Sequence, residues 1–309
     1  MYYTSYKNKN SKSSSFKILI IIISFILLIL IGYLFFSQEI KKILDKEISR
    51  SYIDKLIEHK EYDKALNIIL RYISKGENLN WWYFYKAGII YYYESDYLNS
   101  LLFFRTANVY DNIEKIPVDI NFYIGDNYYK LGKSYYPYSI KYFEKYYKVI
   151  NSSKSLISEE DFLYKLAIMY VETEDYEKAS KVIQKIYQKF ENDYRLLYYY
   201  SIVLKNLNKL KEAIQILNKI IENTSDLDIR KDSLFLLGKI YVDLEDYKKA
   251  IEYFLQCVDI SPNSDISYYY LGYCYSQLHD IKIAINYLTR ALLINNNNQL
   301  AKNLLKALR

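Results

Sequence analysis

The stretch LFLLGKIYVDLEDYKKAIEYFLQCVDISP, residues 234–262, decides the fold. Counted from Lys231 as position 1, it holds large apolar or aromatic residues at positions 4, 7, 11 and 24, Gly at 8, Ala at 20 and Pro at 32. Apolar residues spaced three and four apart form one face of a helix. The stretch therefore predicts two amphipathic helices joined by a turn near Glu245.

The same spacing returns 34 residues later, where a Leu-Gly pair, a Tyr and an Ala occupy the matching positions. Weaker copies precede it and begin at residues 46, 81, 118, 160 and 194. The copy from residue 118 is stretched by about two residues near Pro137. We therefore expect about seven units over residues 46–298 and a cap helix over residues 299–309.

This pattern resembles the tetratricopeptide repeat, which carries Leu-Gly, Tyr, Ala, Phe, Ala and Pro at those spacings. The resemblance implies an all-α fold, a right-handed superhelical solenoid of helix-turn-helix repeats. The clearest departures are Leu234, where the family often has Trp, and Cys257, where it prefers Ala. The low content of Pro (3) and Gly (7) also favours continuous helices over a sheet.

Small residues recur at two positions of the repeat. Ala or Ser stands at position 20, where the resemblance brings the paired helices closest: Ala65, Ser100, Ser139, Ala179, Ala213, Ala250 and Ala284. Gly stands at position 8 in four units: Gly88, Gly125, Gly238 and Gly272. Gly inside a helix costs about 1 kcal/mol relative to Ala, so its return at one register predicts a close contact. Acidic residues ahead of the second helices, as in EDYEKA and EDYKKA, suit the dipoles of those helices.

Residues 18–36, ILIIIISFILLILIGYLFF, form a 19-residue run without a charge. As a helix the run reaches roughly 28 Å, close to the thickness of the hydrocarbon core of a bilayer. It is long for a cleaved signal peptide, and LFFSQEI lacks the small residues that a signal peptidase requires. We expect an uncleaved transmembrane signal anchor, preceded by a basic tail over residues 1–17 and followed by a linker over residues 37–45.

The lysines and arginines that flank this run nearly balance. Four lysines precede it, and three lysines and one arginine lie within residues 37–51. The short leading tail favours an N-terminus inside the cytoplasm and a repeat domain outside it, in the inner or plasma membrane. A cytoplasmic domain on a membrane tether is the alternative.

In the tetratricopeptide repeat, positions 2, 5, 9, 12 and 13 of the first helices line a concave groove. By that resemblance, the predicted partner-binding residues are aromatic or aliphatic: Trp82, Tyr85, Ile89, Tyr92, Tyr93, Phe122, Tyr164, Tyr198, Phe235, Tyr269 and Tyr273. The first five form the densest patch. Such a groove suits an extended peptide or a partner helix. Ordinary packing within the repeats is the competing interpretation, because the chain contains 40 tyrosines.

The tyrosine-rich segment SYYYLGYCYSQL, residues 267–278, divides by the same register. Tyr268 and Tyr275 occupy core positions, whereas Tyr269 and Tyr273 occupy groove positions. Tyr270 has no assigned role.

Little in the sequence indicates catalysis. His59 and His279 lie at expected turns without Cys or His neighbours at metal-ligand spacing, so we expect no metal and no cofactor. Cys257 and Cys274 are expected to be buried thiols, although an exported domain would permit a disulfide. Beyond the N-terminal lysines the net charge is small, which argues against nucleic acid as a partner. The leading hypothesis is a non-enzymatic, membrane-anchored scaffold or assembly factor for protein or peptide partners; a self-associating structural component of an envelope complex is the alternative.

Overall fold

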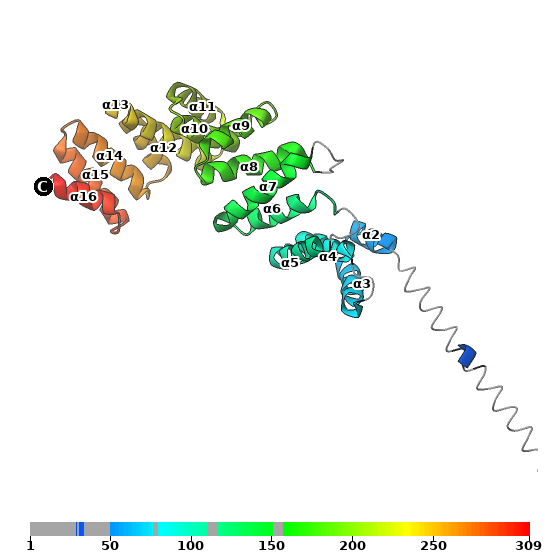
Figure 1. Cartoon of the computed structure of the whole chain (residues 1–309). Helices are drawn as coiled ribbons and strands as arrows, with labels where there is room; N and C mark the ends of the chain where they lie inside the picture. Colours follow the sequence, from blue (N-terminus) through cyan, green and yellow to red (C-terminus); the bar gives the residue numbers. More distant parts are fainter. Residues whose placement is uncertain (1–28, 30, 34–49, 77–79, 111–115, 151–156) are drawn as a thin grey trace, which may run out of the picture.

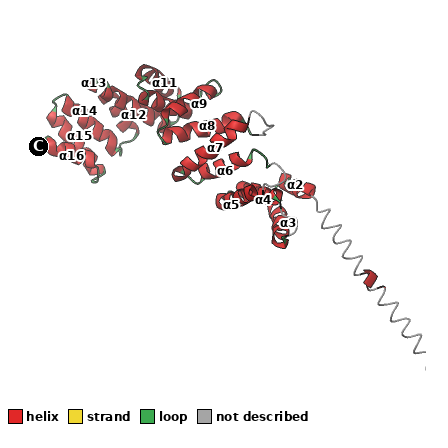
Figure 2. Cartoon of the chain, in the orientation of Figure 1, coloured by secondary structure: helices red, strands yellow, loops and turns green. Residues whose placement is uncertain are grey.

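The computed structural model describes residues 29, 31–33, 50–76, 80–110, 116–150 and 157–309, and every regular element within these ranges is helical (Figures 1 and 2). From residue 50 onward, the helices form seven successive pairs: α2 (Arg50–Glu58) and α3 (Tyr62–Lys75), α4 (Trp81–Tyr93) and α5 (Tyr97–Val109), α6 (Ile120–Lys130) and α7 (Tyr136–Ile150), α8 (Glu159–Glu172) and α9 (Tyr176–Ile186), α10 (Tyr194–Asn206) and α11 (Leu210–Asn223), α12 (Leu227–Asp243) and α13 (Tyr247–Ile260), α14 (Asp265–Gln277) and α15 (Ile281–Ile294). A short 3₁₀ helix, η1 (Lys133–Tyr135), lies in the stretched third pair, and α16 (Gln299–Ala307) ends the chain.

Each helix packs against its partner and against the adjoining pair, which produces the elongated array of Figure 1. The first helices also contact one another, as α8 does with α10 and α10 with α12. The final helix, α16, packs against α14 and α15 and covers Leu288 and Ala291. The predicted all-helical solenoid is therefore confirmed.

The expected membrane anchor, residues 18–36, falls largely outside the described residues. Among the residues that are described, no helix is both long enough and apolar enough to cross a bilayer. The anchor, its orientation and the basic tail remain predictions from the sequence.

The turn inside each of the seven pairs is centred on a residue with a positive φ, at position 15. In six pairs this residue is left-handed, with φ between 59° and 63°: Lys60, Ser95, Glu174, Asn208, Glu245 and His279. In the third pair Gly132 has a φ of 104° and a ψ of −179° instead, and η1 follows it. In the sixth pair the N–H of Glu245 donates to the carbonyl of Val242 (3.0 Å), and the N–H of Asp246 donates to that of Tyr241 (2.9 Å). These two bonds define a Schellman motif, which satisfies the last carbonyls of the first helix. The expected acidic residues at the starts of the second helices are confirmed at Asp175 and Asp246. Their carboxylates accept backbone N–H groups of α9 and α13.

The small residues at position 20 lie where the paired helices meet. All seven side chains have no solvent-exposed surface. The hydroxyls of Ser100 and Ser139 donate to the carbonyls of Gly88 and Gly125, at 2.8 and 2.7 Å. These serines thus occupy a position that alanine holds in the other pairs, and each buried hydroxyl is hydrogen-bonded to the partner helix.

The four glycines at position 8 make the predicted close contact. A Cβ atom on Gly238 would lie 2.6 Å from the ring of Phe254, and one on Gly125 would lie 2.5 Å from the ring of Phe143. The residue at position 24 therefore occupies the space that a side chain at position 8 would need. This packing accounts for the repeated use of a residue that weakens a helix.

Stacked aromatic rings join the two helices of the glycine-containing pairs. The tyrosine at position 11 stacks on an aromatic ring at position 23: Tyr91 on Phe103, Tyr128 on Tyr142, Tyr241 on Tyr253, and Tyr275 on Tyr287. Tyr268 and Tyr275 were expected in the core, but both are only partly buried, and each stacks on Tyr287. Tyr270, which had no assigned role, stacks on Phe254 of the preceding pair with ring centres 5.0 Å apart.

Candidate partner-binding groove

The predicted groove residues at position 5 rest on the core of their own repeats. Phe122 stacks on Phe143 (ring centres 5.6 Å apart), and Phe235 contacts Phe254 (5.5 Å). Tyr85 likewise meets Phe104 at 5.8 Å. These rings pack against the same position-24 residues that exclude a side chain at position 8, which fixes their orientation.

Three of the predicted contact residues are too deeply buried to present a surface. Trp82, Ile89 and Phe122 are each only 7% exposed. Trp82 belongs to the core between the first two pairs, where Arg50 and Lys86 lie over its ring. Their prediction as groove-lining contacts is wrong in this respect, because contacts within and between the helix pairs cover these side chains.

The predicted patch on α4 therefore reduces to its C-terminal end. Tyr93 is 52% exposed and stacks on Tyr62 of α3, with ring centres 5.9 Å apart and planes 8° apart. Ile57, Glu58 and Lys60 complete an open cavity of about 600 Å³ around these two rings. The hydroxyl of Tyr92 instead turns to the next pair and donates to Oδ2 of Asp126 at 2.7 Å.

A buried carboxylate links three consecutive first helices. Asp126 of α6 has no exposed side-chain surface, accepts the Tyr92 hydroxyl from α4 and forms an ion pair with Lys165 of α8. Burial and the neighbouring carboxylate raise the pKa of Tyr92. This network holds neighbouring first helices together and leaves Asp126 inaccessible to a partner.

Another open site on the first helices lies between α10 and α12. Its cavity, about 420 Å³, is lined by Arg195, Tyr198, Tyr199, Asp226, Asp228, Ile229 and Asp232. Burial is the main cause that raises the pKa values of Tyr198 and Tyr199 to about 12. The Tyr199 hydroxyl donates to Oε1 of Glu172 at 3.3 Å, so this ring is held from the preceding repeat. We call this cavity the α10–α12 groove.

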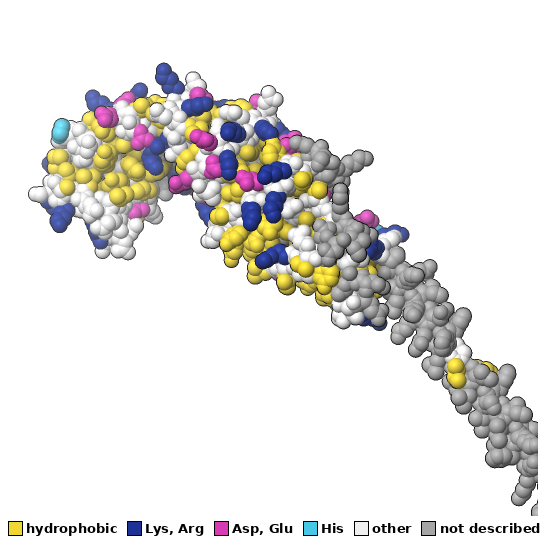
Figure 3. Space-filling view, in the orientation of Figure 1, with side chains coloured by type: hydrophobic (Ala, Val, Ile, Leu, Met, Phe, Trp, Pro, Cys, Tyr) yellow, Lys and Arg dark blue, Asp and Glu magenta, His cyan; other side chains and the backbone are white. Residues whose placement is uncertain are grey.

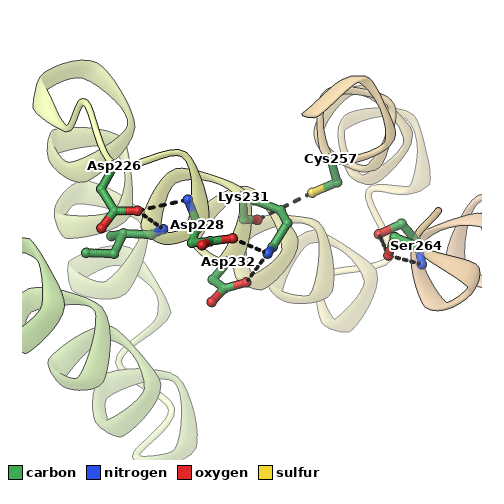
Figure 4. Close-up of polar contacts among 8 residues, drawn as sticks. Asp226, Asp228, Lys231, Asp232, Cys257 and Ser264 are labelled. Carbon is green, nitrogen blue, oxygen red and sulfur yellow. Dashed lines mark hydrogen bonds and ion pairs between the residues drawn. The ribbon is translucent and has the colours of Figure 1, made fainter. Parts of the chain in front are cut away.

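The acidic side of this groove is built on the start of α12 (Figure 4). Asp226 caps the helix by accepting the N–H groups of Asp228 (2.9 Å) and Ile229 (3.1 Å). Lys231 forms ion pairs with Asp228 (2.9 Å) and Asp232 (3.6 Å). Burial nevertheless raises the pKa of Asp232, because it outweighs the effect of Lys231. The groove thus offers two tyrosine rings, one guanidinium and carboxylates to a ligand.

The other predicted residues do not join one site. Tyr164 packs against Phe190, and its hydroxyl donates to Asp193 at 3.4 Å. Tyr269 and Tyr273 lie 6.4 Å apart on α14, both half-buried. Of the predicted residues, Tyr198 lines the α10–α12 groove and Tyr93 the cavity beside α3.

Reasoning from positions 5 and 9 missed two charged groove residues. Arg195 and Asp232 both occupy position 2 of their repeats, a groove position in the family. Charges at position 2 were thus the available signal. Tyr199, at position 6, lines the groove through its contact with the preceding repeat, which the register alone does not reveal.

The histidines and cysteines take simple structural roles. His59 Nδ1 lies 2.7 Å from the carbonyl of Lys55, and His279 occupies a left-handed turn position. Cys257 and Cys274 are buried, unpaired thiols whose pKa values burial raises to about 12. Within the described ranges, no group of three or more His, Cys, Asp or Glu side chains is placed to hold a metal ion.

Comparison with known proteins supports the repeat assignment. Residues 232–264 and 266–298 each match the family model of the tetratricopeptide repeat. The chain is 33% identical over 96 residues to TPR repeat-containing protein MJ0263 of Methanocaldococcus jannaschii, covering 28% of this chain and 30% of that protein. It is 25% identical over 224 residues to TPR repeat-containing protein MJ1428 of the same organism, covering 69% of this chain and 36% of that protein. The chain thus spans about a third of the length of these relatives.

A solved structure shows the same fold. In the crystal structure of the APC/C hetero-tetramer Cut9–Hcn1, one chain superposes with a TM-score of 0.50 at 18% identity, covering 83% of this chain and 48% of that one. The comparisons confirm the resemblance to the tetratricopeptide repeat, directly for residues 232–298 and through the fold for the helix pairs before them.

Proposed function

We propose that this chain is a non-catalytic, membrane-anchored scaffold that binds segments of partner proteins along its first helices. Proteins built from tetratricopeptide repeats generally mediate protein–protein interactions, which supports a binding role. The anchor rests on the uncharged run of residues 18–36.

The α10–α12 groove is the observation that supports this function best. Its walls come from the first helices of two successive repeats, so an extended segment lying there contacts both. Tyr198 and Tyr199 offer flat, half-buried rings for apolar or cationic side chains. Arg195 and Asp232 can pair with charges or backbone groups of the ligand. A peptide with mixed apolar and charged side chains fits this combination.

Site-specific photo-crosslinking tests the proposal. A benzophenone amino acid replaces Arg195 at the edge of the groove in the full chain, expressed in its native membrane. A matched variant carries the same group at Gln215, an exposed position on the second helix α11. We expect residue 195, and not residue 215, to crosslink to one segment of a different protein.

A second substitution separates the groove from general surface contact. Tyr198→Ala combined with Asp232→Lys should abolish the adduct at residue 195 while the helical circular dichroism of the chain is retained. Equal adducts at residues 195 and 215 would contradict a groove-specific partner. Adducts only with other copies of this chain would instead favour the self-associating alternative.

The membrane part of the proposal has its own test. Deletion of residues 18–36 should release the chain from membranes that retain the full chain after alkaline carbonate extraction. Fusions of the C-terminus to reporters active on one side of the membrane only would then assign the side of the repeat array. Release of the full chain by carbonate would contradict the anchor and leave the groove test unaffected.

A further inference from the structure

A second surface, on the second helices, combines exposed apolar side chains with positive charge. The outer face of α5, together with η1 and the start of α7, exposes large apolar side chains: Leu98 (65% exposed), Leu102 (59%), Val109 (73%), Tyr135 (41%) and Tyr138 (56%). Figure 3 shows hydrophobic side chains gathered over this region, with Lys and Arg side chains among them. We call these five residues, with Arg105, Lys141, Lys145 and Lys148, the α5–α7 patch.

The patch is continuous between the two helices. An open cavity of about 740 Å³ separates α5 from α6 and η1, and Leu98, Leu102 and Arg105 line one side of it. Tyr128 lies on the other side, and its ring stacks on those of Tyr135 (6.1 Å), Tyr138 (5.4 Å) and Tyr142 (6.0 Å). A layer of tyrosine rings thus joins the apolar stripe of α5 to the outer face of α7.

The charges of the patch are all positive. Helix α5 contains Arg105 and no acidic residue. The one acidic residue of α7, Glu144, is engaged by α8 and α9, because it accepts the Tyr170 hydroxyl (2.8 Å) and pairs with Lys178 (3.1 Å).

The lysines of α7 face solvent without a counter-charge. Lys141, Lys145 and Lys148 are exposed, and no ion pair within the described ranges involves them. Four other second helices, α3, α9, α11 and α13, each expose an acidic residue: Asp63, Glu177, Glu212 and Glu252.

We propose that the α5–α7 patch docks on a bilayer surface that contains anionic lipids. Leucine and tyrosine side chains favour the boundary between headgroups and acyl chains, and lysines beside them bind lipid phosphates. The excess of positive charge complements the negative surface potential of such a membrane. The inference rests on the proposed anchor in one respect: the anchor would keep the α5–α7 patch close to the bilayer.

Fluorescence at one position of the patch tests this docking. Asn108→Cys places a thiol on the exposed face of α5, and an environment-sensitive dye labels it selectively because Cys257 and Cys274 are fully buried. The full chain is mixed with vesicles of phosphatidylcholine, with or without one part in about three of phosphatidylglycerol. We expect a blue shift and quenching by brominated lipid only with phosphatidylglycerol. The matched probe, Gln215→Cys on α11, should show neither change.

Charge reversal identifies the contact. Lys141→Glu, Lys145→Glu and Lys148→Glu together should lower the ratio of docked to undocked chain by at least about a hundredfold, because the loss of three lysines alone removes about 3 kcal/mol of attraction. The control triple, Lys211→Glu, Lys248→Glu and Lys282→Glu, changes the net charge equally at exposed sites on other helices and should dock like the parent chain.

The outcomes for patch and anchor are distinct. Equal dye spectra in the two vesicle types, or equal losses for the two triple variants, would overturn the proposal. Flotation of the chain with pure phosphatidylcholine vesicles reports the anchor separately. A chain that floats only with phosphatidylglycerol vesicles would refute the anchor and support the patch.

Discussion

At the scale of single residues, the contact between Gly238 and Phe254 sets how closely a helix pair packs. Gly238→Ala raises helix propensity by about 1 kcal/mol, yet its Cβ would lie 2.6 Å from the Phe254 ring. Overpacking of this kind typically costs about 1–3 kcal/mol, so we expect a net loss of stability. Urea unfolding of the full chain in mild detergent, followed by circular dichroism, measures it.

The fourth helix pair supplies the control for this prediction. At the same two positions, the fourth pair has Ala167 and Ile183, both fully buried. The double variant Gly238→Ala with Phe254→Ile introduces the same two residue types at these positions. It should recover most of the stability that Gly238→Ala alone loses. Additive losses in the double-mutant cycle would show that the two positions do not compete for the same space.

At the scale of elements, the left-handed turn residue offers a way to stabilise the array. Glu245 has a φ of 59°, a conformation that costs non-glycine residues roughly 1–2 kcal/mol. Glu245→Gly relieves this strain but gives the unfolded chain more freedom. We therefore expect a net gain of up to about 1 kcal/mol, seen as a higher thermal midpoint. Glu245→Ala removes the same charge but keeps the strain, and an equal gain from it would contradict this explanation.

The helical register made most elements predictable, because positions within one helix pair repeat with the sequence. The resemblance to the tetratricopeptide repeat placed Ala at position 20 in the pair interface, and the recurrence of Gly at position 8 indicated close packing there; the structure confirms both. Contacts between successive pairs were harder to predict. The stacking of Tyr270 on Phe254 and the burial of Trp82 depend on how one pair lies on the next, which a 34-residue pattern does not encode.

In the groove, too, positions within one repeat were predictable and contacts between repeats were not. Tyr198 could be predicted at the groove, since its position belongs to the first helix of its own repeat. Tyr199 could not, because its hydroxyl is held by Glu172 of the preceding repeat. The left-handed turns were also hidden, since six of the seven use residues other than glycine at position 15.

At the scale of the whole molecule, the many half-buried tyrosines make alkaline pH destabilising. Burial raises the pKa values of Tyr198 and Tyr199 to about 12 and also raises those of Tyr85 and Tyr123. Unfolded tyrosines ionise near pH 10. Between about pH 10 and 12 the unfolded chain therefore binds fewer protons than the folded chain, and stability falls as pH rises. Below about pH 9 these tyrosines are protonated in both states and contribute no pH dependence.

Absorbance of tyrosinate near 295 nm, together with circular dichroism, checks this prediction in the full chain. We expect the urea midpoint to decrease from pH 9 to pH 12, and a fraction of the tyrosines to ionise only as helicity is lost. Tyr198→Phe with Tyr199→Phe removes two of the responsible groups and should make the decrease shallower. Tyr52→Phe provides the control, because this tyrosine is 48% exposed and lies outside the proposed anchor. If all tyrosines ionised near pH 10 with helicity intact, burial would not be holding these hydroxyls protonated.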